Sequence, residues 1–212
     1  MENIGLVRNL MLASLLVAPA CVAEVDDDGQ LDGNTDDDLG LTEATRSSVC
    51  PAGTPAALAP PSDQNLAFYL DATGVQKYSC NATATGATWS FVAPVADLLD
   101  DCRQVGTHYA GPTWEYRDGS TVVAAKVAGA TVDPTAIPWL LLTAVSHGGP
   151  AGKMTGVTSI QRLSTAGGNA PAAGCDGTHL GATIDVPYTA RYFFYRTSLN
   201  SPLRNTRCGA TP

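Results

Sequence analysis

The sequence predicts an all-β domain, a single antiparallel sandwich or barrel with at most one short helix. About nine short runs rich in β-branched and aromatic residues follow one another between residues 65 and 196. Gly, Pro, Asn and Asp separate most of these runs, and no tandem repeat of fixed period occurs. Closely spaced short strands of this kind are typical of sandwiches and barrels.

The first runs predict strands joined by short turns. LAFYL (66–70) ends at the turn-like DATG (71–74), and VQKYSC (75–80) alternates between two faces. WSFVA (89–93) has the composition of a third strand. The short distances between these runs favour hairpins.

PVADLLDDC (94–102) is the one helix candidate. Its first residue is a proline, which suits the first position of a helix. A helical period would place Val95, Leu98, Leu99 and Cys102 on one side. We therefore expect a short helix here.

The second half of the domain predicts further strands. Asp-Gly-Ser at 118–120 has the composition of a hairpin turn. IPWLLLTAVS (137–146) is continuously apolar, which favours a buried central strand. Pro187 indicates a strand edge or a bulge. The strand candidates are residues 112–117, 121–129, 137–146, 156–165 and 182–196.

The N-terminus predicts export. Residues 1–20 combine Arg8 with an apolar stretch and the small residues before Cys21, as in a signal peptide. Cys21 leaves two alternatives. Lipidation would anchor an outer envelope lipoprotein to the membrane, whereas ordinary cleavage would release an extracellular protein. We expect lipidation at Cys21, with the membrane as a partner.

Residues 21–49 predict a disordered acidic tether, and residues 50–212 the β domain. Positions 24–43 hold nine acids and no Lys or Arg, so like charges keep this segment extended. The β domain has ten acids and ten bases, so the tether accounts for most of the net charge of −8. Because the domain has no basic stripe, we expect no nucleic-acid partner.

The cysteines after Cys21 predict disulfides, the default in an oxidising compartment. Two bridges and one remaining thiol are the simplest arrangement of five cysteines, and spacing leaves their connectivity open. None has the close spacing of a zinc or redox motif, so we expect no metal site and no cofactor. These cysteines are Cys50, Cys80, Cys102, Cys175 and Cys208.

Several of these blocks are similar in order and content to the domain-of-unknown-function 3455 family, over residues 53–196. The resemblance implies a secreted or lipid-anchored bacterial β domain, with distant fungal relatives and no established activity. Cys80 and Cys175 lie in shared blocks, so the resemblance implies that they form a disulfide, and Cys208 then pairs with Cys50 or Cys102. The resemblance rests on TGVQKYSC (73–80), Trp89-x-Phe91-x-Ala93-Pro94, HYAGPTWEYRDGS (108–120), IPWLLL (137–142), IQRLSTAGG (160–168) and VPYTARYFFY (186–195).

Chemistry, if the domain has any, is predicted at His108. Its imidazole could act as a general base or a metal ligand, with Glu115 or Asp118 as the carboxylate partner. The alternative is a histidine whose ring bonds to a loop backbone. Tyr109 and Trp114, around a Gly-Pro turn, are the candidates for an exposed ligand-binding surface, and the alternative for each is a place in the core.

We therefore expect an exported protein whose β domain binds an unknown ligand or partner through the loops around His108–Trp114. The alternative is a metal-dependent or His-based enzyme centred on His108. His147 and His179 would complete a three-histidine site only if the fold brought them to His108. No serine-nucleophile motif is present.

Overall fold

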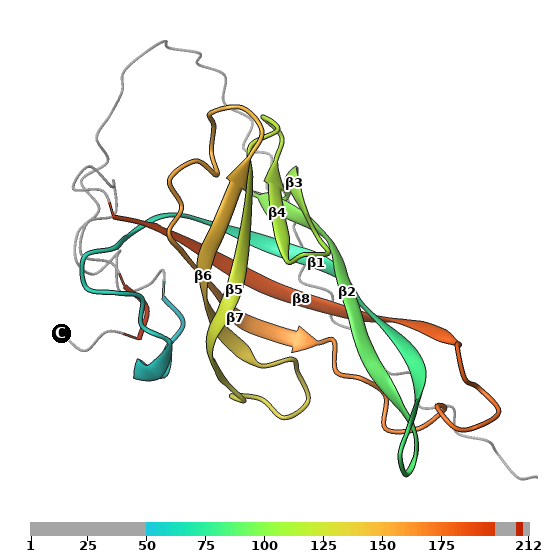
Figure 1. Ribbon diagram of the computed structural model, residues 1–212. Coiled ribbons are helices and arrows are strands. Elements are labelled where there is room, and N and C mark those ends of the chain that lie inside the picture. The colour runs from blue at the N-terminus through green and yellow to red at the C-terminus, as the bar shows by residue number, and fades with distance from the viewer. Residues whose placement is uncertain (1–49, 198–206, 210–212) are drawn as a thin grey trace, which may run out of the picture. The chain divides into compact units, whose positions relative to one another are not determined.

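The computed structural model describes residues 50–197 and 207–209, which form a closed antiparallel β-barrel (Figure 1). The predicted signal peptide, Cys21 and the acidic tether lie outside these residues. Within the described part of the chain, no helix has the length and hydropathy needed to cross a membrane.

Eight strands follow one another around the barrel in sequence order, and β1 closes it by pairing with β8. The all-β prediction is confirmed, with the barrel rather than the sandwich as its form. A single 3₁₀ turn, η1, precedes the first strand. The elements are η1 (Ala56–Leu58), β1 (Asn65–Thr83), β2 (Gly86–Asp100), β3 (Arg103–Tyr109), β4 (Thr113–Tyr116), β5 (Thr121–Ala130), β6 (Trp139–Gly148), β7 (Ser159–Gly167) and β8 (Thr183–Arg196).

β1 is continuous, so the turn predicted at 71–74 is wrong. Gly74 faces Ala96 across the β1–β2 pair, and a Cβ at Gly74 would lie 2.2 Å from the carbonyl oxygen of Val95. The glycine therefore allows two backbones to approach closely inside a strand instead of reversing the chain.

The helix predicted at 94–102 is also wrong, because residues up to Asp100 belong to β2. Ala96 and Leu98 are buried while Val95 and Asp97 are exposed, which is the alternation of a strand. Only Leu98 of the four residues expected on one helical face is fully buried. Pairing with the long β1 decides the outcome, since it satisfies the backbone of β2 along this segment.

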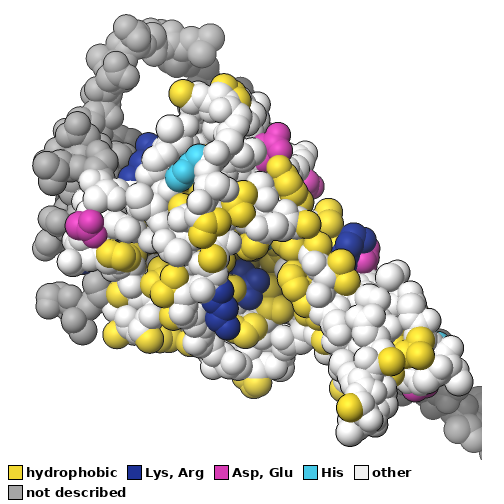
Figure 2. All heavy atoms as spheres, in the orientation of Figure 1, with side chains coloured by type: hydrophobic (Ala, Val, Ile, Leu, Met, Phe, Trp, Pro, Cys, Tyr) yellow, Lys and Arg dark blue, Asp and Glu magenta, His cyan; other side chains and the backbone are white. Residues whose placement is uncertain are grey.

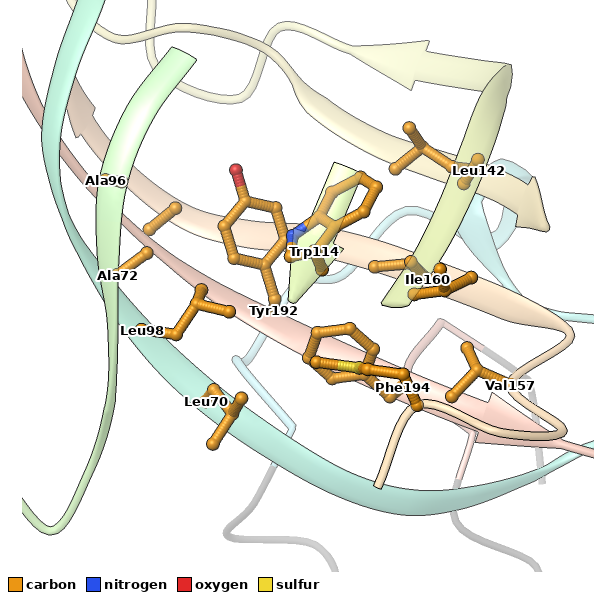
Figure 3. Packing of buried hydrophobic residues seen from close by; sticks show 14 of the residues in the cluster. Leu70, Ala72, Ala96, Leu98, Trp114, Leu142, Val157, Ile160, Tyr192 and Phe194 are labelled. Atoms are coloured by element: carbon orange, nitrogen blue, oxygen red, sulfur yellow. The ribbon is translucent and has the colours of Figure 1, made fainter. Parts of the chain in front are cut away.

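The barrel interior holds the larger of two hydrophobic clusters (Figure 3). Phe194 lies at its centre and stacks on Phe68, with ring centroids 4.6 Å apart. Leu70, Leu98 and Ile160 fill the space between the strands. The inward residues alternate with outward ones along each strand, as expected for a barrel that side chains nearly fill.

A second cluster lies on the outer side of β6, β7 and β8, where Trp139, Leu163 and Phe193 pack against Leu58 and Cys208. The segments before β1 and after β8 thus cover this part of the barrel. This explains why the 137–142 run is apolar at every position, since Leu140 and Leu142 pack with the inner cluster while Trp139 and Leu141 belong to the outer one.

Gln161 ties both terminal segments to the barrel wall. Its amide nitrogen donates to the carbonyl oxygens of Leu58 and Cys208, and the hydroxyl of Tyr195 donates to its Oε1. The Cys208 backbone N–H donates in turn to the Tyr195 hydroxyl at 3.3 Å. All partners are buried, so water has little access to replace these hydrogen bonds when one of them is lost.

Two disulfides are present within the described residues. Cys50–Cys208 joins the segment before β1 to the segment after β8. Cys80–Cys175, the pair that the family resemblance implies, fixes the long β7–β8 connection to the end of β1. None of the five cysteines of the domain is a free thiol, so the expected remaining thiol is wrong.

Candidate functional site

A pocket of about 390 Å³ opens into the barrel. Its exposed apolar rim includes Phe91 and Val145, which are 55% and 59% exposed. Figure 2 shows hydrophobic and basic side chains together in a hollow near β5 and β7. Every strand contributes to the lining, with Gln76, Pro94, His108, Trp114, Ala124, Leu142, Arg162 and Tyr192 coming from β1 to β8 in order. The pocket is therefore a product of barrel closure.

Aromatic rings form the deep wall of the pocket. The His108 imidazole stacks on the Trp114 indole, with centroids 4.2 Å apart and planes 13° apart. Tyr192 meets both rings edge-on, at 5.1 Å from His108 and 5.3 Å from Trp114. Figure 3 shows the Trp114 and Tyr192 rings side by side inside the barrel. Such a wall offers a flat apolar surface with little freedom to move.

His108 is neutral and has a fixed tautomer. It is only 3% exposed, and its Nδ1 lies 2.8 Å from the carbonyl oxygen of Thr113. Burial lowers the pKa of His108 to about 3, partly offset by this hydrogen bond. Because a carbonyl only accepts, Nδ1 carries the proton and Nε2 has the free lone pair. With so low a pKa, His108 is a weak general base.

Two basic residues line the pocket. Arg162 faces the interior from β7 and is anchored by two bonds to the carbonyl oxygen of Pro138, at 3.1 and 2.9 Å. Lys126 enters from β5, where the register with β6 skips Val127. A bulge re-aims neighbouring side chains, which accounts for Lys126 lining the pocket next to Ala124 and Ala125. No acidic residue is among the lining residues.

The polar end of the pocket also contains buried donors. Gln76 is 2% exposed, and its Nε2 lies near the Tyr188 hydroxyl without a hydrogen bond of normal geometry to it or to any other described residue. The indole nitrogen of Trp114 likewise has no acceptor among the described residues and is next to the Tyr192 ring. An unmatched buried donor costs about 1–3 kcal/mol, so a ligand that accepts from it gains affinity.

Three tyrosines surround the same region. The Tyr78 hydroxyl donates to the carbonyl oxygen of Gly168 at 2.6 Å, and the Tyr188 and Tyr192 hydroxyls lie 3.4 Å apart. Burial raises the pKa of all three, while the positive charge of Arg162 opposes the rise. Each hydroxyl is therefore protonated, and the field of Arg162 reaches into the barrel.

The structure does not bring Glu115 or Asp118 to His108. Glu115 accepts a hydrogen bond of 2.9 Å from the Tyr109 hydroxyl, and neither residue lines the pocket. Asp118 accepts from the hydroxyl and N–H of Ser120 and from the Lys153 N–H, which fixes two loops together. These bonds lower the pKa of Asp118.

The structure separates Trp114 from Tyr109, the two candidates for one binding surface. Trp114 is 1% exposed yet lines the pocket, so its candidate binding face is internal. Tyr109 is 36% exposed and lies outside the lining. The Gly111-Pro112 turn between them does line the pocket.

The other histidines lie elsewhere. His147 Nε2 is 2.8 Å from the carbonyl oxygen of Val157, and His179 pairs with Asp176. Within residues 50–197 and 207–209, no group of three His, Cys, Asp or Glu side chains is placed to hold a metal ion.

Sequence reasoning missed Gln76, Lys126 and Arg162. Arg162 is two positions after the buried Ile160 on the same strand, so alternation places both side chains on the inner face. This spacing was the sequence signal for a cation inside the barrel. Gln76 shares parity with Tyr78 and Cys80 in the alternating 75–80 run. Lys126 had no comparable signal, because the bulge next to it breaks the alternation.

Fold and pocket together define a small eight-stranded antiparallel barrel with an aromatic, positively charged internal site. The chain belongs to the family described as protein of unknown function (DUF3455), whose model matches residues 61–104 and 101–196. No curated protein and no solved structure matches the chain.

Proposed function

We propose that this protein is an exported binding protein that holds a small, largely apolar ligand in the barrel pocket. The observation that carries the proposal is the cavity of about 390 Å³ to which all eight strands contribute. Ligand pockets usually measure about 300–1,000 Å³ and are mainly apolar with a few polar groups. Barrels of eight strands have room for one small ligand, which is an argument from architecture alone.

Export is supported by the N-terminal sequence and by two disulfides, which persist in oxidising compartments. The two alternatives at Cys21, lipidation and ordinary cleavage, differ in a measurable way. Label from a fatty acid on the wild type and none on a Cys21→Ser variant supports a lipid anchor at the outer envelope, with residues 21–49 as the spacer. An unlabelled wild type supports an extracellular protein.

A neutral fluorescent probe tests the pocket. N-phenyl-1-naphthylamine is expected to brighten on binding to the wild type. Ala125 lines the pocket and is exposed, so Ala125→Trp should block the mouth without disturbing the core. Ala166, an exposed strand alanine outside the lining, supplies the control Ala166→Trp. Equal binding by both variants would contradict the proposed site.

The alternative function, an enzyme centred on His108, has less support. Its Nδ1 is committed to Thr113 and its pKa is about 3, so it serves better as a hydrogen-bond acceptor than as a base. Metal analysis of protein purified without added metal tests this alternative. A stoichiometric transition metal that is lost in His108→Ala would favour the enzyme.

A further inference from the structure

The pocket lining has two positive charges and no negative charge, and it has hydrogen-bond donors without acceptors. We propose that it selects a carboxylate attached to a compact apolar body. The carboxylate lies between Arg162 and Lys126, and the apolar body rests on the Trp114 and His108 rings. This inference rests on the proposed function, because it names the class of ligand for the same pocket.

The two cations of the pocket lack carboxylate partners among the described residues. Two other bases of the barrel form ion pairs, Lys77 with Asp185 and Arg191 with Asp71, each at 2.7 Å. Arg162 has only neutral partners, the Pro138 carbonyl and the Tyr192 hydroxyl. Lys126 is exposed, and it has neither a hydrogen bond nor an ion pair within this part of the chain. A ligand carboxylate supplies the missing negative charge, and its two oxygens match the fork of an arginine.

Gln76 provides the independent observation. Its side chain is nearly completely buried and lines the pocket. Its Nε2 lies near the Tyr188 hydroxyl but makes no hydrogen bond of normal geometry there. An ionised carboxylate accepts only, with room for about four hydrogen bonds. It can therefore satisfy a guanidinium, an ammonium and an amide donor together, which a hydroxyl or a neutral amide cannot do as completely.

The rest of the wall limits the apolar body. A cavity of about 390 Å³ lies near the lower end of the usual range for ligand pockets. The flat His108–Trp114 stack and the exposed Phe91 and Val145 at the rim suit a ring system or a short alkyl chain. A bicyclic aromatic acid matches both features.

The test compares 2-naphthoate with 2-naphthamide, which share a body and differ in charge, by titration calorimetry at pH 7. We expect the carboxylate to bind at least about tenfold more tightly to the wild type, since a charge-assisted hydrogen bond contributes more than a neutral one. Lys126→Met should reduce this ratio several-fold, and Lys126→Met combined with Arg162→Met should bring it near one.

The ratio of the 2-naphthoate and 2-naphthamide affinities distinguishes a loss of carboxylate recognition from a damaged fold, because a damaged barrel loses affinity for both compounds. Lys77→Met is the matched control, since Lys77 is a strand lysine that does not line the pocket, and it should leave the ratio unchanged. Gln76→Met, a change of similar volume, should lower carboxylate affinity more than amide affinity.

Two results overturn the inference in different ways. If both compounds bind equally to the wild type, carboxylate selection is wrong and the apolar pocket stands. If neither compound binds and the neutral probe also fails, the proposed function itself is wrong.

Discussion

The imidazole of His108 lies flat on the indole of Trp114, with ring centroids 4.2 Å apart. The two residues are direct partners across the β3–β4 pair, and both point into the barrel. Because its ring is stacked and buried, His108 forms part of the aromatic wall of the pocket, although the sequence suggested a catalytic group. Its one hydrogen bond, to Thr113, fixes the ring and leaves Nε2 as an acceptor.

Removing this ring should destabilise the barrel. His108→Ala deletes a buried aromatic ring and leaves the Thr113 carbonyl without its partner, so we expect a loss of about 2–4 kcal/mol in the free energy of unfolding. Urea denaturation measures this loss. His179→Ala, at an exposed ion pair, should cost less than about 1 kcal/mol. Equal losses for the two variants would show that the stack contributes nothing.

Acid should weaken the wild-type barrel through His108. The folded pKa of His108 is about 3 and its ordinary value is near 6.5, so the unfolded chain binds a proton in this range that the barrel does not. The contribution is complete above pH 6.5 and is lost as pH falls toward 3, by at most about 1.4 kcal/mol per pH unit.

His108→Phe isolates this effect, because the variant keeps an aromatic ring and has no proton to gain. We expect the stability of the wild type to fall more steeply than that of the variant when urea unfolding is measured between pH 7 and pH 4.5. The aspartates with lowered pKa values are common to both proteins and cancel in the difference. Parallel curves would contradict a neutral, buried His108.

The outer cluster should depend on the Cys50–Cys208 bridge. The two cysteines are 158 positions apart, so removing this one bridge releases a long loop and should cost about 3–5 kcal/mol. The paired variant Cys50→Ser with Cys208→Ser should show the same loss under denaturant, while probe binding in the folded protein persists because the pocket lies on the inner side of the wall. An unchanged unfolding midpoint would show that the terminal segments add no stability.

Gln161 and Tyr195 should behave as a coupled pair. Gln161→Leu removes donors to two carbonyl oxygens, and Tyr195→Phe removes one donor to Gln161 and one acceptor for Cys208. We expect the double variant to lose about 1–2 kcal/mol less than the sum of the single losses. Strict additivity in a double-mutant cycle would contradict the network.

Alternation and turn residues predict the all-β class and locate the site near the His108–Trp114 segment. They fail where pairing with a distant strand decides the structure. Residues 94–100 extend because β1 offers them a partner, and Gly74 lies within a strand because β2 approaches it closely. Neither partner is visible in the local sequence.

The inner face of the site was harder to predict than its position. Because the chain bends at Gly111-Pro112, the sequence does not show which side chains after the bend face the interior. The sequence therefore left Trp114 between a surface and a core position, and the structure places it in the core. Arg162, Gln76 and Lys126 meet only because the barrel closes and β5 carries a bulge next to Lys126. Their proximity depends on the registers of all eight strand pairs, and no single segment of the sequence determines these registers.

The most direct test of a ligand inside the barrel uses the indole N–H signals of the tryptophans in a nitrogen–proton correlation spectrum. Trp114 lines the pocket, whereas the Trp89 N–H donates to the carbonyl oxygen of Ala173 outside it. Trp89→Phe and Trp139→Phe assign the signals by loss. Binding of N-phenyl-1-naphthylamine should shift the Trp114 signal and leave that of Trp89 in place. A saturating probe that leaves Trp114 unmoved, or moves Trp89 alone, would contradict an internal binding site.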